Sequence, residues 1–260
     1  MKRIVLLLFS MAILGCGTTS GVRRSFEHHQ HSMNYLFDSV ENVEKKNMLI
    51  YLNDIKFSAG NLPDSFVVEK EKRYFIPLIF LNYWKGVYLC KLGKKNIYED
   101  LDNFISSSFR SEVERSGRFQ LTDDVNADYQ LDLEFSNIIS EGIYTQSGKF
   151  HYLIFLYMWG SSQSTSSIHA SILSNVKLSR NDEIVFEKDV SIKKTQYPMS
   201  TSSMTAAELK YNFAIQLVEN LSLCFKECFE DIVAELNNCV DLIKVNNQQN
   251  RFLTKDSEID

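Results

Sequence analysis

Two segments of the chain carry apolar residues at the spacing of an amphipathic helix. In the first, apolar residues recur every four positions from Leu101 to Val113, which places them along one face. We expect this helix to begin at Asn96, with Glu99 as its capping partner. We expect it to end where Gly117 adopts a left-handed conformation.

The second helical segment lies near the end of the chain. Thr205 and Glu208 form a capping box, and an apolar stripe then runs from Leu217 to Ile232. Residues 246–260 are polar, and we expect them to form a frayed C-terminal tail.

Strict alternation of apolar and polar residues predicts β-strands. It covers residues 129–135 and then 168–178, which forms a hairpin with 184–192; residues 48–57 form a further strand. Strands, helix, strands and helix in this order predict a single α+β domain over residues 47–245. We expect an antiparallel sheet with the two amphipathic helices packed on one face.

One run of residues, from Phe150 to Trp159, is apolar or aromatic at nearly every position and is too short to span a bilayer. It is either a fully buried central strand or an exposed apolar patch that binds lipid or a partner. The candidate patch residues are Tyr152, Leu153, Phe155, Tyr157 and Trp159. The Ser/Thr-rich stretch 161–167 that follows is typical of a mobile loop.

The first sixteen residues resemble the export segment of a bacterial lipoprotein. Lys2 and Arg3 precede an apolar run, Ile4 to Leu14, whose length fits a signal peptide. Gly15 and Cys16 then match a lipobox, in which a small residue precedes the cysteine that receives the lipid.

This resemblance implies a processed and membrane-anchored protein. Residues 1–15 would be removed, Cys16 would carry palmitate-like acyl chains, and residues 16–46 would form a tether. Gly17, in place of an aspartate, implies the outer membrane. Several acyl chains hold a protein on a membrane more stably than one.

Composition agrees with a folded domain behind such an anchor. The 260 residues are 44% hydrophobic and 23% charged, which excludes a disordered chain and a polytopic membrane protein. The formal charge is −5, and loss of Lys2 and Arg3 with the signal peptide would make it −7. This balance argues against nucleic acid as a partner, because such binding needs a basic surface.

The sequence offers no recognisable catalytic or metal-binding motif. The histidines 28, 29 and 31 lie in the predicted tether, and Asp123, Asp124 and Asp128 lie in a predicted turn, so we expect no bound metal and no cofactor. His151 and His169 are the histidines of the predicted domain. A hydrolase using either of them is an alternative to a non-enzymatic protein.

Four cysteines remain after Cys16, at positions 90, 224, 228 and 239. Small apolar core residues are the favoured interpretation. The sequence leaves their disulfide status open.

The helix end and the strand that follows resemble a recurring pattern of bacterial envelope lipoproteins. The matching segments are 101–104, 108–110, 114–119 and 127–131, within an arrangement that covers residues 48–240. They are similar to the auxiliary lipoproteins of ABC-type transport systems and to the LPS-assembly lipoprotein group. The resemblance supplies no catalytic residues.

The resemblance implies a periplasm-facing, non-enzymatic accessory in envelope transport or assembly, which binds an envelope protein complex or lipid. A surface-exposed lipoprotein that binds extracellular molecules is the other alternative, besides the hydrolase.

Overall fold

The computed structural model describes most of the chain. Its described residues are 19–36, 48–57, 62–77, 81–153, 156–199 and 204–256, with backbone alone at 71–75, 77, 152–153, 156–157, 159 and 244–256. Cys16 and the predicted signal peptide lie outside them.

The described residues form one seven-stranded sheet. Its strands are β1 (Leu49–Phe57), β2 (Val67–Pro77), β3 (Leu81–Lys91), β4 (Gln120–Thr122), β5 (Tyr129–Leu153), β6 (Leu156–Arg180) and β7 (Glu183–Gln196). The pairings among β2, β3, β5, β6 and β7 are antiparallel, and β1 joins β5 and β4 in parallel. The predicted hairpin of β6 and β7 is confirmed.

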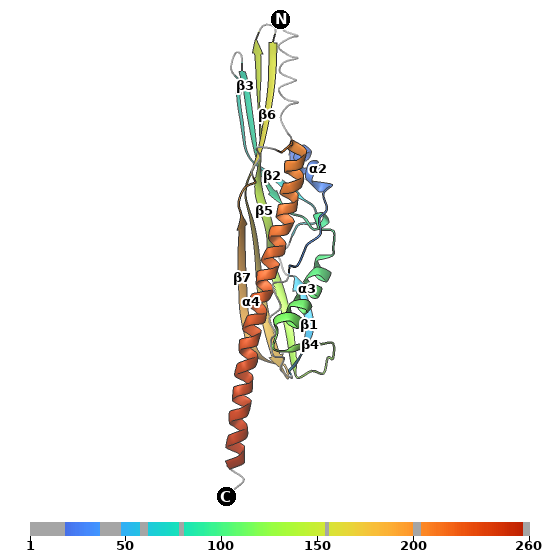
Figure 1. Cartoon of the computed structure of the whole chain (residues 1–260), viewed down its shortest axis with the longest axis vertical. Coiled ribbons are helices and arrows are strands. Elements are labelled where there is room, and N and C mark those ends of the chain that lie inside the picture. The colour runs from blue at the N-terminus through green and yellow to red at the C-terminus, as the bar shows by residue number, and fades with distance from the viewer. Residues whose placement is uncertain are drawn as a thin grey trace.

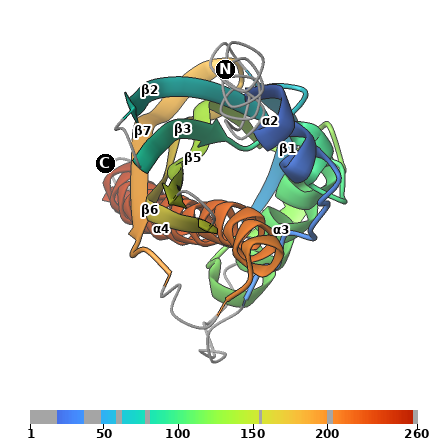
Figure 2. The ribbon, with the colours of Figure 1, turned by 90° about the horizontal axis from the view of Figure 1, so that it is seen from above.

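Besides the short 3₁₀ helix η1 (Lys94–Asn96), three α-helices complete the described fold, which confirms the α+β class. They are α2 (Thr19–Glu27), α3 (Leu101–Ser116) and α4 (Ala206–Asp256). Seen along the long axis, the strands curve around these helices, so that sheet and helices enclose one common core (Figure 2).

The sheet is organised by the long hairpin of β5 and β6. Each strand has 25 residues, which corresponds to roughly 80 Å at about 3.3 Å per residue. On its other edge β5 pairs first with β1 and then with β3, so those two strands lie end to end along it.

The core lies between the sheet and α4. Along β5, alternate residues from Tyr129 to Phe135 are buried, as the sequence pattern predicts. They meet a stripe on α4 that includes Phe225 and Phe229, both fully buried. The ring of Phe135 lies 6.0 Å from that of Phe225 and 6.1 Å from that of Phe229. This packing explains why α4 forms along the sheet.

The helices cover only part of the sheet. Tyr144 is the last residue of β5 whose ring packs on both Phe26 of α2 and Phe213 of α4. Beyond this level the strands continue past the start of α4 (Figure 1). We call residues 72–77, 81–87, 145–153 and 156–164, which the strand register places at one level, the finger. The rest of the described chain is the body.

The segment before β1 differs from the predicted tether. Within residues 19–36, Val22, Phe26 and Met33 are buried in the core. Asn96 donates from Nδ2 to the carbonyl oxygens of Phe26 and His29, at 3.1 and 3.0 Å. The packed domain therefore includes residues 19–36, because three apolar side chains in this polar stretch find partners on the sheet and helices.

The ends of α3 also differ from the prediction. The helix begins after Asp100, whose carboxylate accepts from the backbone N–H of Asp102, while Asn96 is occupied with α2. Gly117 ends it with a φ of −71°, outside the left-handed region. A Cβ at Gly117 would lie 2.6 Å from the carbonyl oxygen of Val113, so close approach is what requires glycine here.

Two other predicted segments have a different structure. Residues 161–167 are not a loop but part of β6, where their backbone pairs with β5 and Ser147 meets Ser162 at 2.8 Å. The C-terminal tail continues α4 as a helix through Asp256. The capping box that starts α4 is confirmed, since Thr205 N–H donates to Glu208 at 2.7 Å.

Candidate functional site

The predicted apolar patch lies at the end of the finger. The run from Phe150 to Trp159 is not one strand, because it forms the end of β5, the connection and the start of β6. Phe150 pairs with Trp159, and Tyr152 pairs with Tyr157. Phe155 lies outside the described residues, and Leu153 is the last residue of β5.

A second apolar hairpin end lies beside the first. The register pairs Ile76 of β2 with Tyr83 of β3, and Leu81 of β3 with His151 of β5. The sequence from Tyr74 to Trp84 contains no charged residue, and neither does the run from Phe150 to Trp159 if His151 is neutral. The sheet therefore brings two uncharged, aromatic-rich hairpin ends together.

Among the described side chains at this end, those of Ile76, His151 and Met158 are exposed, and those of Leu81, Asn82, Tyr83 and Phe150 are half-buried. Met158 is 62% exposed and Ile76 is 49% exposed, although both are large and apolar. Among the finger residues with described side chains, only Trp84, Gly86 and Gly148 are buried. Exposed apolar surface that is contiguous marks a site of contact with a partner or a lipid.

Charge in the finger has one sign. Its charged residues are Lys72, Arg73, Lys85 and Lys149, and it contains no aspartate or glutamate. Glu71 lies one residue below it, at an irregularity in the β2–β3 ladder. Because the whole chain has a charge of −5, subtracting these four cations leaves −9 for all other residues.

Aromatic packing on glycine supports the finger from within. The indole of Trp84 lies over Gly148, its direct cross-strand partner. A Cβ on Gly148 would fall 2.4 Å from Nε1 of that indole. At Gly160, in contrast, an added Cβ would meet nothing within 4 Å. Gly148 therefore lies on a packed face of the finger, whereas Gly160 lies next to open space.

The two histidines considered for catalysis lie apart from each other. His151 is exposed on the finger. His169 is exposed on β6, and its Nδ1 lies 3.0 Å from Oγ1 of Thr195. The structure does not bring the two histidines together in one site.

The histidines and the aspartates considered as metal ligands lie in two separate groups. His29 and His31 pack their rings around Tyr211 of α4, at 5.5 and 5.1 Å. Asp123 pairs with Arg110 at 2.9 Å, and Asp124 accepts from the backbone of Asn126. Within the described ranges no three His, Cys, Asp or Glu side chains gather as a metal site.

The four remaining cysteines are buried and free, which agrees with the core interpretation. Burial raises the pKa of Cys90 and Cys224 to about 12. Thiols with so high a pKa are largely protonated near neutral pH, and a protonated thiol is a poor nucleophile.

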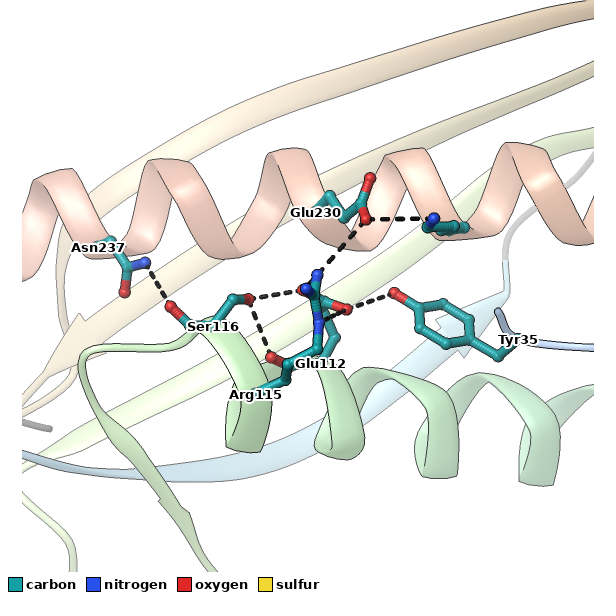
Figure 3. A network of polar contacts seen from close by, with 7 residues as sticks. Tyr35, Glu112, Arg115, Ser116, Glu230 and Asn237 are labelled. Carbon is teal, nitrogen blue, oxygen red and sulfur yellow. Dashed lines mark hydrogen bonds and ion pairs between the residues drawn. The ribbon is translucent and has the colours of Figure 1, made fainter. Parts of the chain in front are cut away.

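A buried polar network joins the N-terminal segment, α3 and α4 (Figure 3). Glu112 of α3 is completely buried. Its carboxylate accepts from Tyr35 at 2.8 Å, from Arg115 at 2.6 Å and from Ser116 at 2.6 Å. Arg115 also reaches Glu230 of α4, at 3.5 Å.

The network sets the charge of Glu112. Burial by itself raises the pKa of this carboxyl, but the hydrogen bonds from Arg115, Ser116 and Tyr35 outweigh burial and lower it below its ordinary value. Burial and the nearby Glu112 charge raise the pKa of Tyr35. Glu112 is therefore an ionised anchor point between elements, with its hydrogen-bonding capacity used inside the network.

A small cleft of about 280 Å³ opens between α3 and β4. It is lined by Arg110, Val113, Glu114, Phe119, Gln120 and Leu121. Its single cation, Arg110, is paired with Asp123. The cleft brings no nucleophile and base together.

No helix within the described ranges is long and apolar enough to cross a membrane.

Comparisons with known proteins assign no family. No model of a protein family matches the sequence, and no curated protein matches it. Similar solved structures include protein XCC0632 of Xanthomonas campestris, of family DUF330, with a TM-score of 0.38 and 13% identity over 86% of this chain and 97% of that one. The hypothetical protein CT253 of Chlamydia trachomatis has a TM-score of 0.34 and 11% identity, over 75% of this chain and 99% of that one. Likenesses this weak carry no conclusion about function.

The β2–β3 half of the finger end was missed as part of the site. Its sequence signal is an uncharged run, Tyr74 to Trp84, that has the same character as Phe150 to Trp159. Only the pairing of β3 with β5 joins the two runs.

Proposed function

We propose that the protein is a lipid-anchored, non-enzymatic accessory of the cell envelope that binds a partner or lipid through the end of its finger. The observation that carries this proposal is the juxtaposition of two uncharged hairpin ends beyond the reach of α4, with Met158 and Ile76 exposed. A folded protein rarely exposes contiguous apolar surface without a partner for it.

The lipobox at Cys16 supports the anchor. An acylated N-terminus would keep the domain at a membrane through buried acyl chains. Gly17 favours the outer membrane, and the resemblance to envelope lipoproteins favours a domain that faces the periplasm.

Metabolic labelling with a palmitate analogue tests the anchor. The parent protein is expected to be labelled, and Cys16→Ser is expected to be unlabelled. An unlabelled parent would contradict the anchor.

Site-specific photocrosslinking in cells tests the binding role. A photoreactive residue in place of Met158 is expected to capture envelope transport or assembly components, or lipid. The matched control replaces Val125, which is 58% exposed but lies on the body, and is expected to capture none of them. Equal capture from both positions would remove the finger from the proposal.

Protease treatment of intact cells tests the orientation. Protection of the domain is expected for a protein that faces the periplasm. Digestion on intact cells would instead favour a surface-exposed lipoprotein that binds extracellular molecules.

A further inference from the structure

We propose that the finger docks on an anionic lipid surface, with its uncharged end in the interface and its four basic residues at the lipid head groups. This inference deepens the proposed function and rests on it, because it names lipid as the chemistry that the finger end binds.

The first argument is where the four cations lie. Lys149 is four residues from the end of β5, Lys85 is four residues from the start of β3, and Arg73 is four residues from the end of β2. Lys72 is one residue further from that end. By register, the four cations span β3 from Tyr83, opposite Lys149, to Val87, opposite Lys72, which is about 13 Å of strand at about 3.3 Å per residue.

The register joins these positions across neighbouring strands. Tyr83 pairs with Lys149, Tyr74 pairs with Lys85, and Arg73 pairs with Gly86. The cations thus form a belt over β2, β3 and β5, with only uncharged residues and His151 beyond it. We call this set of four residues the basic belt.

The dimensions of the belt and the end fit one leaflet of a bilayer. A hydrocarbon core of about 30 Å gives about 15 Å per leaflet, which is similar to the roughly 13 Å of strand between Lys149, the cation nearest the tip, and the end of β5. Lys and Arg can keep their charged groups at the head groups while their stems lie against apolar surface. Each basic residue near an anionic surface contributes to the attraction.

The residue types beyond the belt also suit a lipid interface. Tyr and Trp are enriched where membranes meet water, since their rings are apolar and their tips polar. The finger end holds Tyr83, Tyr152, Tyr157 and Trp159 beyond the belt or at its level by register.

Charge complementarity favours an anionic lipid surface, and not the finger of a second copy of the chain, as the binding partner. The basic belt would repel another basic belt, whereas anionic head groups above an apolar layer match both halves of the finger. The acidic body of a second copy also has the opposite charge.

The chain carries its own probe for this contact. It has two tryptophans, Trp84 and Trp159, and both lie on the finger. Trp84 is 5% exposed and packed on Gly148, whereas Trp159 lies closer to the strand end. Quenching of Trp159 by brominated acyl chains would therefore report entry of the finger end into lipid.

The experiment uses the purified full chain, as parent and as Cys16→Ser, with vesicles that contain brominated lipid. Vesicles of phosphatidylcholine alone are compared with vesicles that also contain phosphatidylglycerol. Quenching is expected on the anionic vesicles for both forms. It is expected to persist in Trp84→Phe and to disappear in Trp159→Phe.

The charge variants give the quantitative test. Lys85→Gln combined with Lys149→Gln is expected to lower the equilibrium constant for the quenched state about 30-fold, from about 1 kcal/mol per removed cation. The matched control is Lys94→Gln combined with Lys95→Gln, which removes the same charge from exposed positions on the body. It is expected to change that constant less than about threefold, because those charges lie outside the basic belt.

Three results would overturn the inference. They are the absence of Trp159 quenching on anionic vesicles, equal quenching on neutral vesicles, and an equal decrease of the equilibrium constant for the quenched state in the two lysine-pair variants. Concentration-dependent mass by light scattering that depends on Lys85 and Lys149 would assign the belt to self-association instead. Failure of the palmitate labelling would remove the anchor alone, since quenching by the Cys16→Ser chain does not depend on it.

Discussion

The body and the finger share the strands β5 and β6 but stabilise them in different ways. In the body, alternate residues of β5 from Tyr129 to Tyr144 are buried against helices. In the finger this alternation stops, and β5 continues for nine residues, or about 30 Å, beyond Tyr144. The strands thereby extend past the start of α4 (Figure 1). The body contains the acidic charge, whereas the finger contains cations only.

This difference shows that hydropathy alone does not report burial. The apolar run from Phe150 to Trp159 lies at the end of the finger, and Met158 within it is 62% exposed. The less apolar strand Tyr129 to Phe135 supplies the core, because α4 lies over it. Position relative to the helices decides which apolar residues are covered.

Truncation of large apolar side chains should separate the two regions most strongly. Phe229→Ala is expected to lower the free energy of unfolding by about 3–5 kcal/mol, because its buried ring contacts Phe109, Phe135 and Phe225. Met158→Ala should change it by less than about 0.5 kcal/mol, since that side chain is exposed. Urea unfolding measures both. Comparable losses would mean that the finger end is covered within the protein.

Loss of the buried Glu112 carboxylate of the body should have the next largest effect on the free energy of unfolding. Glu112→Gln is expected to cost about 3 kcal/mol, because Arg115 then lacks the charge of its buried partner. Glu114→Gln is the matched control, one exposed carboxyl on the same helix, and should cost less than about 0.5 kcal/mol. Equal urea midpoints for the two variants would show that the network contributes little.

The lowered pKa of Glu112 predicts that the stability contributed by this carboxylate of the body depends on pH. Glu112 has a pKa below its ordinary value of 4.5 in the folded state, so its contribution is present above pH 4.5 and is lost as the pH falls through the folded pKa. The stability difference between the parent and Glu112→Gln should therefore shrink on acidification below pH 4.5. A difference that stays constant from neutral to acid pH would contradict the lowered pKa.

The body was largely predictable from sequence, for reasons that its residues make plain. The alternation of apolar residues from Tyr129 to Phe135 predicts the buried face of β5. The four-residue spacing from Leu101 to Val113 predicts the buried face of α3. The capping box at Thr205 is a local interaction, and it needs no knowledge of the fold.

The finger could be predicted only in part, because it depends on pairings between distant residues. The apolar run at Phe150 was identified, but its contact with the run at Tyr74 requires the pairing of Leu81 with His151. The docking of residues 19–36 was missed for the same reason, since Asn96 and the core supply its partners from far along the chain.

Two glycines of the finger provide a smaller and more local test. Gly148→Ala is expected to cost about 1–3 kcal/mol, because the new Cβ would displace the indole of Trp84. Gly160→Ala should be neutral or slightly stabilising, since its Cβ meets nothing within 4 Å. Urea unfolding and the tryptophan emission maximum measure the two effects. Equal behaviour of both variants would show that Trp84 does not pack on β5.

The smallest expected change in stability concerns His31, which lies where the N-terminal segment meets α4, close to the base of the finger. Burial and the nearby His29 both lower the pKa of His31, whose ring packs on Tyr211. A histidine with a lowered folded pKa contributes stability that is complete above pH 6.5 and is lost as the pH falls through the folded value. Between pH 7 and pH 5 the parent should therefore lose more stability than His31→Gln does. His28→Gln, an exposed neighbour, should follow the parent. If His31→Gln were as acid-sensitive as the parent, the contact between the N-terminal segment and α4 would not depend on a neutral His31.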